Sequence, residues 1–543
     1  MKKAVKILAI TLALILAVAS FAGCGKEDVA KEKGKYTYWV PLDANSAQTV
    51  SSFDDLLMYQ ELEKRTGVDV DFIHPSKGST GGEAFQILLT STNMPDMIEY
   101  DWTAYPGGPD KAIENKVIIS INKYMKDCAP NYYSYMEGDR AADNGYRYKV
   151  ESITQNGNYY GFKNMNFGSR RCFNGFIVRK DMLDKWGLEV PVTIDDWDNV
   201  LKTAKENGIK KPLTGSNALF AVNGSNRFNV AWNVGKDFHL EDDKVIFALE
   251  KPEYKEYVAH MAEWFKNGYV DHDYITNTSE VIKANMTNGT SVAVNGFIGG
   301  MMGTLLPAMA EKDPNYNVVA CPVPVLKEGD IPWSHVIQGE SLEPTIAITY
   351  NCGATDEERY KEAMKWCDYL YSDEGTVLKC FGVEGKTFKE VTREDGTVGY
   401  DYLITSPEEM EKIGAHSVEA ALWHYARPAN APGFNQHDDY LRGFYPYQQQ
   451  IDAIQLWNIE ENIENARKHN LPTLSYTDEE ATKIAELKNK CEAKLDTAIS
   501  KIICNEAGID TFDAAVKAAK KDGYDELKKI YQAAYDRYLS NLK

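Results

Sequence analysis

The chain has 543 residues, with 60 Lys and Arg against 80 Asp and Glu, so its formal net charge is −20. Apolar residues make up 43% and charged residues 26%, an ordinary globular composition that excludes a disordered chain. The mean hydropathy of −0.44 excludes a polytopic membrane protein. Because an acidic surface repels phosphate groups, the charge also argues against electrostatic binding to nucleic acid or to a membrane surface.

The first 23 residues differ from the rest of the chain. Residues 1–6 are basic, residues 7–21 are almost wholly apolar, and the small residues Ala22 and Gly23 precede Cys24. This order is typical of a secretory signal peptide, and the apolar run is too short to span a bilayer comfortably. Small residues directly before a cysteine resemble a bacterial lipobox, in which the cysteine is lipidated. We therefore expect residues 1–23 to be removed and Cys24 to carry a lipid; the alternative is an ordinary signal peptide with an incidental cysteine.

Residues 24–35 are polar and lack an apolar period, so we expect a flexible tether between the lipid and the folded body. Removal of the signal peptide removes three lysines and makes the mature net charge −23. Eight cysteines remain beyond Cys24, and their spacing does not fit a zinc site. We interpret them as buried thiols, although an even number outside the cytosol permits disulfides.

Strand and helix patterns alternate from residue 36 onward. The first group has strand patterns at 36–40, 68–72 and 96–99 and helical patterns at 53–66 and 84–92. This order predicts an α/β lobe with a largely parallel sheet. The alternation restarts after residue 165, with strand patterns at 176–178 and 291–294 and helical patterns at 180–186, 193–206 and 253–266. The restart predicts a second α/β lobe.

The C-terminal part of the chain is dominated by amphipathic helix. Thr355 and Thr477 each begin a run that resembles a capping box. Two apolar stripes at helical spacing follow in the last 70 residues: Ile484, Leu487, Leu495, Ile499 and Ile502, and then Leu527, Ile530, Ala534 and Leu539. These stripes predict helices that pack on the folded body.

The motifs of common enzyme classes are absent from the sequence. It contains no G-x-S-x-G, no P-loop, no H-E-x-x-H and no glycine-rich dinucleotide loop after a strand. The nine histidines are scattered, and His424 and His437 near Asp438 are interpreted as solvated loop residues rather than metal ligands. We therefore assign no catalytic residue, no metal and no cofactor.

Aromatic residues are abundant, with 33 Tyr and 10 Trp. Sugars present apolar C–H faces and a rim of hydroxyl groups, so a sugar site needs flat aromatic rings beside polar side chains. Five tryptophans lie outside helical core patterns and are candidates for such rings: Trp39, Trp102, Trp232, Trp333 and Trp423. Core packing is an equally weighted interpretation for each of them, and it is the better one for Trp186, Trp197, Trp264 and Trp366.

Several stretches together resemble a known family. They include EKRTGVDVDF (63–72), MPDMIEYDW (94–102), NGNYYGFKN (156–164), FIVRKDMLDKWGLEVPVTIDDWDNVLKTAKENG (176–208), EYKEYVAHMAEWFKNGYVDHDY (253–274), YLYSDEGTVLKCFGVEGKTF (369–388) and ELKKIYQAAYDRYL (526–539). With the lipobox, they resemble the extracellular solute-binding proteins (family 1) of ABC transporters, specifically the large LipO-like lipoproteins of Firmicutes. The resemblance runs from Cys24 to about Leu539.

The resemblance implies an α/β type II periplasmic-binding-protein fold, in which two lobes close on a ligand by a hinge motion. We expect the first part of lobe I at 36–165, the first part of lobe II at 166–322, and chain crossings with a helical C-terminal extension at 323–543. The resemblance further implies a monomer on the outer face of a Gram-positive cell membrane, attached only by its lipid. Its partners would be an oligosaccharide and the permease subunits of an ABC importer.

The resemblance also suggests ligand contacts. By analogy we expect them at Trp39 and Asp43 after the first strand, at Asp101 and Trp102, and at Trp232. A second group comprises Trp333, Trp423 and Arg427. Several relatives carry a calcium loop after the helix that corresponds to 193–206, but Lys210 and Lys211 stand here where oxygen ligands would be needed. We therefore predict no calcium at that position.

The sequence also permits three other functions. The same fold could bind a peptide or another polar solute. The chain could be a surface lipoprotein that binds carbohydrate without delivering it to a transporter. It could also be a secreted glycoside hydrolase, an interpretation that the missing catalytic motif disfavours.

Overall fold

The computed structural model describes residues 35–542, apart from 77–78, 145, 167–170, 223–227, 334–336, 354–355 and 394–395. The predicted signal peptide, the predicted lipidation site Cys24 and the tether up to residue 34 lie outside the described residues.

The larger of the two main sheets has six strands in the order β14-β4-β11-β3-β1-β2. Their bounds are β1 Lys35–Trp39, β2 Asp69–Ile73, β3 Met97–Tyr100, β4 Phe162–Asn166, β11 Ser341–Ile348 and β14 Gly433–Asn435. β1 runs parallel to β2 and β3, whereas β11 runs antiparallel to β3 and β4. The carboxyl ends of β3 and β4 therefore lie at the same edge of the sheet as the amino end of β11.

Helices and a hairpin surround this sheet. Successive side chains of a strand point to opposite faces, and accordingly Tyr36 and Tyr38 of β1 pack in one core and Trp39 in another. The first core contains residues of α2 Leu57–Thr66, α5 Met125–Cys128, α6 Pro130–Met136, α14 Glu357–Tyr369 and α15 Asp373–Phe381; the second contains residues of α3 Gly81–Leu89 and α4 Gly108–Glu114. The hairpin consists of β12 Phe388–Thr392 and β13 Val398–Tyr402. The remaining helices of the larger-sheet half are α7 Arg147–Val150, α13 Tyr350–Gly353, α16 Pro407–Lys412, α17 Val418–Tyr425 and α18 Asp438–Phe444.

The smaller sheet has four strands in the order β10-β5-β9-β6. Their bounds are β5 Asn174–Arg179, β6 Leu213–Thr214, β9 Ala293–Phe297 and β10 Val318–Ala320. The neighbouring elements are α8 Lys180–Trp186, α9 Ile194–Glu206, α10 Pro252–Lys266, α11 Ser279–Thr287, α12 Gly303–Met309 and the hairpin of β7 Phe238–Glu241 and β8 Lys244–Phe247. Asn174 lies opposite Phe297 in the antiparallel β5–β9 pair. Phe297 therefore lies at the sheet edge where the chain arrives from β4 of the larger sheet.

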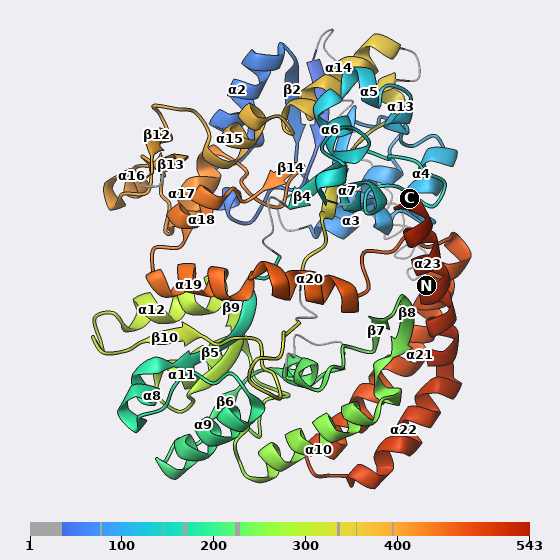
Figure 1. Ribbon diagram of the computed structural model, residues 1–543. Helices are drawn as coiled ribbons and strands as arrows, with labels where there is room; N and C mark the ends of the chain where they lie inside the picture. The colour runs from blue at the N-terminus through green and yellow to red at the C-terminus, as the bar shows by residue number, and fades with distance from the viewer. Residues whose placement is uncertain are drawn as a thin grey trace, which may run out of the picture.

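The chain passes between the two sheets more than once: from β4 to β5, back from β10 to β11, and again from β14 to α19 Gln448–Trp457, which packs on β10. α19 and α20 Glu460–His469 lie between the two halves of the molecule (Figure 1). The chain then continues along the smaller-sheet half as α21 Asp478–Ile503, α22 Phe512–Ala519 and α23 Asp525–Asn541.

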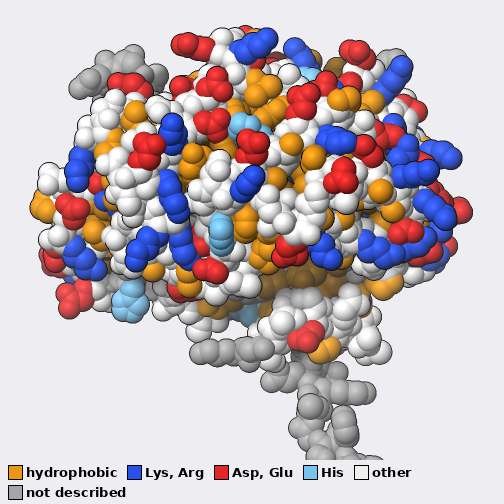
Figure 2. All heavy atoms as spheres, turned by 90° about the horizontal axis from the view of Figure 1, so that it is seen from below, with side chains coloured by type: hydrophobic (Ala, Val, Ile, Leu, Met, Phe, Trp, Pro, Cys, Tyr) orange, Lys and Arg blue, Asp and Glu red, His pale blue; other side chains and the backbone are white. Residues whose placement is uncertain are grey.

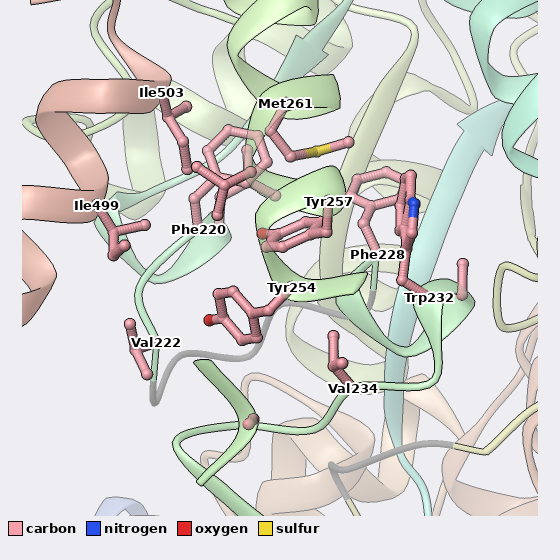
Figure 3. Packing of buried hydrophobic residues seen from close by; sticks show 14 of the residues in the cluster. Phe220, Val222, Phe228, Trp232, Val234, Tyr254, Tyr257, Met261, Ile499 and Ile503 are labelled. Atoms are coloured by element: carbon pink, nitrogen blue, oxygen red, sulfur yellow. The ribbon is translucent and has the colours of Figure 1, made fainter. Parts of the chain in front are cut away.

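The C-terminal helices share a core with the smaller sheet. Figure 3 shows Ile499 and Ile503 of α21 pointing toward Phe220, in the core that also contains Met261 of α10. The predicted stripe residues Leu487, Leu495, Ile499 and Ile502 are all buried in this core, as is Leu527 of α23. The helices therefore extend the smaller-sheet half of the molecule, as their apolar stripes predict.

Most predicted elements are confirmed within a few residues. The helix predicted at 193–206 is α9, and Thr193 forms the capping box expected for it. The helix predicted at 53–66 differs, because Leu56 is extended, with φ −73° and ψ 122°, so that only 57–66 is α-helical. A short 3-10 turn, Phe53–Asp55, precedes it.

The surface seen from below the molecule carries both signs of charge. Figure 2 shows acidic and basic side chains interspersed over this face rather than gathered into separate patches. The net negative charge therefore does not form a single acidic face on this side. Among the residues that the structure describes, none of the helices is both long and apolar enough to cross a membrane.

Candidate ligand-binding site

Two of the predicted contacts, Trp39 and Trp102, lie in the core between the larger sheet, α3 and α4. Trp39 is 4% exposed and Trp102 is fully buried. The Trp102 ring meets Phe85 edge-on at 5.3 Å between centroids, and the Trp39 ring lies 6.2 Å from the same phenylalanine. Both rings are thus packed against protein rather than held open to a ligand.

The other three predicted tryptophans are also buried. Trp232 lies beside Tyr257 and His260, with ring centroids 5.6 and 5.4 Å away. Trp333 stacks on His469 at 4.8 Å. Trp423 is 2% exposed. The structure therefore places none of the five rings on a surface, and their role as ligand contacts stays a prediction.

Two predicted residues, Asp43 and Arg427, are brought together. Arg427 Nε lies 2.9 Å from Asp43 Oδ2, and its two Nη atoms lie 2.8 and 2.9 Å from the Glu99 carboxylate. Arg427 also donates to the hydroxyl oxygen of Tyr59 at 3.1 Å. Glu99, which the sequence analysis missed, lies on β3 and is 2% exposed. The cluster holds the segment after α17 against the ends of β1 and β3.

Burial shapes the titration of this cluster. It raises the pKa of the Asp43 carboxyl, and the neighbouring Arg427 opposes that rise. Burial also lowers the pKa of the nearby Lys379 to about 8. The Lys379 ammonium donates to the backbone carbonyl of Phe434 at 2.9 Å. The predicted contact Asp101 has a different partner: its Oδ1 accepts hydrogen bonds from the backbone N–H and the hydroxyl of Thr103.

A cavity of about 920 Å³ lies near the carboxyl end of β3. Three of its walls come from the loop after β3 together with α4, from residues 151–163, and from the start of β11. The fourth comes from residues 473–482, which comprise the end of the linker between α20 and α21 and the first turn of α21. A volume of this size is within the range of ligand pockets. Its lining offers the partly exposed tyrosine rings of Tyr105 and Tyr476 and polar side chains suited to hydroxyl groups, namely Thr103, Thr154, Gln155, Asn156 and Asn158. Tyr160 also lines the cavity, but it is only 5% exposed.

One wall of this cavity is a hydrogen-bonded group around Tyr160. The Tyr160 hydroxyl donates to Glu343 Oε1 at 2.8 Å, and Lys163 Nζ donates to the tyrosine oxygen at 2.8 Å. Lys163 also forms an ion pair with Glu343. Burial raises the pKa of Tyr160 well above its usual value, so the hydroxyl stays protonated. The ring orientation is thus fixed by polar partners on adjacent strands.

A second wall is organised by Asp110 of α4. Its Oδ1 accepts hydrogen bonds from Thr154 Oγ1 at 2.6 Å and Asn158 Nδ2 at 2.8 Å. Its Oδ2 accepts one from the backbone N–H of Asn156 at 3.3 Å. The carboxylate therefore ties α4 to the 154–158 turn through neutral donors.

The linker between α20 and α21, residues 470–477, joins the two halves of the molecule. Gln155 Nε2 donates to the Ser475 carbonyl at 2.6 Å, and Ser475 Oγ donates to the Ile153 carbonyl at 3.1 Å. Tyr476 packs toward Tyr531 of α23, with ring centroids 6.0 Å apart, in the smaller-sheet core. A ligand in the cavity would therefore touch the larger-sheet loops and the linker at once.

Phe297 offers an exposed aromatic ring at the end of β9. Its relative exposure is 61%, the second highest among the exposed large hydrophobic side chains of the described residues. Ligands of α/β proteins bind outside the carboxyl ends of strands, which is where this ring stands. The sequence analysis missed Phe297; its position directly after the strand pattern at 291–294 is the signal that could have found it.

Comparisons with known proteins decide the family. The sequence pattern of the bacterial extracellular solute-binding proteins matches residues 43–377. The chain belongs to this family. It is 23% identical over 547 residues to the lipoprotein LipO of Bacillus subtilis (strain 168), covering 96% of this chain and 98% of LipO. The resemblance inferred from the sequence is therefore confirmed.

Solved structures of other solute-binding proteins share the fold. An HMO-binding solute-binding protein of Bifidobacterium longum infantis superposes with a TM-score of 0.69 at 17% identity, covering 94% of this chain and 99% of its own. The Streptococcus pneumoniae protein FusA in complex with kestose gives 0.64 at 20% identity, covering 93% and 100%. These neighbours confirm the two-lobed α/β type II fold expected for this solute-binding protein.

A network of charged groups lies where the chain of this solute-binding protein crosses back to β11. Glu340 pairs with Arg171 and with Arg467, whose Nη2 lies 2.6 Å away. Glu151 Oε2 accepts hydrogen bonds from the backbone N–H groups of Glu340 at 2.6 Å and Ser341 at 3.0 Å. Burial raises the pKa of Glu151 to about 7. This crossing therefore holds a buried carboxyl group whose charged form is disfavoured by burial.

Lys211, at the position where we predict no calcium, binds two carboxylates. Its Nζ lies 2.8 Å from Asp271 Oδ1 and 2.9 Å from Asp273 Oδ2. Burial would raise the pKa of Asp271, but the hydrogen bonds from Lys211 and Asn277 hold it below its usual value. A lysine ammonium thus supplies positive charge to this turn, and the absence of calcium stays a prediction.

The described cysteines carry free thiols. Seven of the eight beyond Cys24 are buried, and Cys504 is partly exposed. Burial raises the pKa of the Cys321 thiol well above its usual value. These thiols behave as small apolar core residues, in agreement with the interpretation from the sequence.

Proposed function

We propose that this extracellular solute-binding protein captures an oligosaccharide in the cavity near β3 and delivers it to the permease of an ABC importer. The observation that carries the proposal is the lining of that cavity. Tyrosine rings can pack against the apolar faces of sugars, while the amide and hydroxyl groups beside them can bind sugar hydroxyls. Phe297, on the smaller sheet, would supply a further ring on closure of the two halves.

The relatives support a carbohydrate ligand. The curated FusA protein of Streptococcus pneumoniae, a fructooligosaccharide ABC transporter substrate-binding protein, is 26% identical over 291 residues, 48% of this chain and 52% of FusA. Two structural neighbours bind saccharides by their descriptions, kestose and HMO. These proteins bind substrates and are not described as enzymes, so we propose that this chain has no catalytic activity.

We further propose that the two halves move as lobes about the crossings between the sheets. The larger-sheet lobe would begin with residues 36–165 and the smaller-sheet lobe with 166–322, and residues 323–543 would complete both. A ligand that contacts both lobes stabilises the closed form. We propose a monomer, anchored at the outer face of the membrane by two acyl chains on Cys24, which would suffice without a membrane-spanning helix.

Thermal-shift measurements on the purified protein test the ligand class. Neutral oligosaccharides should raise the unfolding midpoint by several degrees, since a ligand that binds only the native state stabilises it in proportion to ln(1 + [L]/Kd). Short peptides at the same concentration should leave the midpoint unchanged. A shift with peptides and none with saccharides would contradict the proposal and favour a peptide-binding protein.

A further inference from the structure

We propose that the cavity near β3 selects neutral or amino-bearing saccharides and rejects acidic ones. The inference rests on the proposed function, because it concerns what the same cavity accepts.

The walls carry far more acids than bases. Six carboxylic acids line the cavity but only two lysines: Asp110, Glu114, Glu151, Glu343, Asp478 and Glu479 against Lys111 and Lys163. Both lysines have carboxylate partners, since Lys111 Nζ lies 2.8 Å from Glu114 and Lys163 pairs with Glu343. Among the described lining residues there is no arginine. A ligand carboxylate would therefore have to compete with a resident carboxylate for either lysine.

Three of the acids form no ion pair with a lysine or arginine within the described part of the chain. Asp110 accepts its hydrogen bonds from the neutral groups of the 154–158 turn. Asp478 and Glu479 are exposed at the start of α21. Among the described side chains, no ion pair joins a Lys or Arg to any of these three carboxylates. The negative charges of Asp110 and Glu479 are therefore available to the cavity, whereas that of Asp478 is partly balanced by Lys111, whose pKa is raised mainly by Glu114 and also by Asp478.

The start of α21 would ordinarily attract an anion, because a helix N-terminus carries partial positive charge. Here that end is already occupied. Thr477 Oγ1 accepts from the backbone N–H of Glu480, and the Glu480 carboxylate accepts from the backbone N–H of Thr477. Asp478, Glu479 and Glu480 together place three acids in the first turn. The helix end is thus neutralised by its own residues.

The consequence for ligands follows from elementary electrostatics. Charges that line a partly enclosed cavity are screened less than charges on an open surface, where the screening length is about 8 Å at physiological ionic strength. A uronic acid would be repelled and would lose hydration without gaining a partner. Neutral hydroxyls can donate to the carboxylates, and an ammonium group can pair with them.

Three tetrasaccharides with one backbone test the charge preference. We compare β-1,4-linked tetramers of glucose, glucosamine and glucuronic acid by titration calorimetry. The glucuronic acid tetramer should bind about tenfold more weakly than the glucose tetramer, and the glucosamine tetramer at least as tightly as glucose. Asp478→Asn combined with Glu479→Gln should shrink the difference between the charged tetramers, whereas Glu486→Gln, farther along α21 and outside the cavity, should not.

A second measurement reads the cavity without a sugar. Asn156→Cys places a thiol on the cavity wall, and Thr92→Cys places one on an exposed turn elsewhere in the larger-sheet half. The rates of modification by a cationic and an anionic methanethiosulfonate reagent are followed by peptide mass spectrometry. The cation-to-anion rate ratio should be several-fold higher for the Asn156→Cys variant than for the Thr92→Cys variant. Adding Asp478→Asn and Glu479→Gln to the cavity variant should lower its ratio.

The outcomes separate the two proposals. Equal or tighter binding of the glucuronic acid tetramer, or equal reagent ratios for the two thiol variants, would overturn the charge preference and leave carbohydrate binding standing. A high reagent ratio in the cavity with no binding by a broad panel of saccharides would contradict the proposed function instead.

Discussion

Arg427 and Asp43 lie 384 positions apart in the sequence, yet their side chains form an ion pair with 2.9 Å between Nε and Oδ2. The same guanidinium makes two hydrogen bonds to Glu99. Asp43 follows β1, Glu99 lies on β3 and Arg427 follows α17. One buried arginine thus connects three parts of the larger-sheet half near the strand ends.

Replacement of this arginine should destabilise the protein strongly. Arg427→Met leaves Glu99, which is 2% exposed, without its cation. Removal of one partner from a buried ion pair costs about 3–5 kcal/mol, because the other charge remains desolvated. Urea unfolding followed by circular dichroism measures the loss.

The neighbouring Arg442 provides the control. It is 65% exposed and lies 3.2 Å from Asp439. Arg442→Met should cost less than about 1 kcal/mol, as exposed ion pairs usually do. Equal losses for the two variants would contradict the structural role of Arg427.

Glu151 should make stability fall as pH rises. Its folded pKa is about 7 because burial disfavours the charged form, whereas an unfolded glutamate titrates near about 4.3. Between these values the native state binds more protons than the unfolded state. The group therefore favours folding fully below about pH 4 and loses about 3 kcal/mol of that contribution by pH 8.

Glu151→Gln should flatten this dependence, since glutamine does not titrate and can still accept a hydrogen bond from Glu340 or Ser341. The free energy of unfolding of the variant minus that of the parent should increase between about pH 5 and pH 8. Asp368, whose pKa is about 6 for the same reason, remains and keeps part of the slope. Parallel pH profiles for parent and variant would show that Glu151 does not carry the effect.

Lys211 should act as the resident cation of its turn. Lys211→Met leaves Asp271, which is fully buried, without its ammonium partner, and should cost about 1–3 kcal/mol in urea unfolding. The exposed neighbour gives a matched control, and Lys210→Met should change stability little. A chelator should leave the unfolding midpoint of the parent unchanged; a clear drop would reveal a bound divalent cation and contradict the prediction.

Phe297 should contribute to binding but not to stability. Phe297→Ala removes a ring that is 61% exposed, so the unfolding midpoint should change little. Loss of one aromatic contact should weaken binding of a neutral oligosaccharide by about tenfold, measured by calorimetry. Ile275→Ala removes another exposed apolar side chain of the smaller-sheet half and should leave affinity unchanged. Unaltered affinity in Phe297→Ala would remove this ring from the ligand site.

Local rules account for most of the fold that could be predicted from the sequence. α9 is an example, because a capping threonine at 193 and apolar residues at helical spacing are visible within a single short segment. The break at Leu56 is not visible in this way. Phe53, just before the break, packs against Tyr59, Phe72 and His74, and these contacts involve the neighbouring strand rather than the local sequence.

The candidate site depends on contacts between distant positions, so less of it was predictable. Trp39 was expected to face a ligand because it ends a strand, but Phe85 and Tyr100 enclose its ring. Glu99 gives no local sign that its partner is Arg427. One wall of the cavity is held to another by hydrogen bonds of Ser475 with Gln155 and Ile153, which lie 320 and 322 positions away.

The most direct test of carbohydrate capture is the crystal structure of the protein grown with a neutral oligosaccharide that raises its unfolding midpoint. We predict electron density for the sugar in the cavity lined by Tyr105, Tyr160 and Tyr476, with a hydroxyl near Asp110 or Glu479. Density for the sugar elsewhere, with this cavity filled only by solvent, would contradict the account.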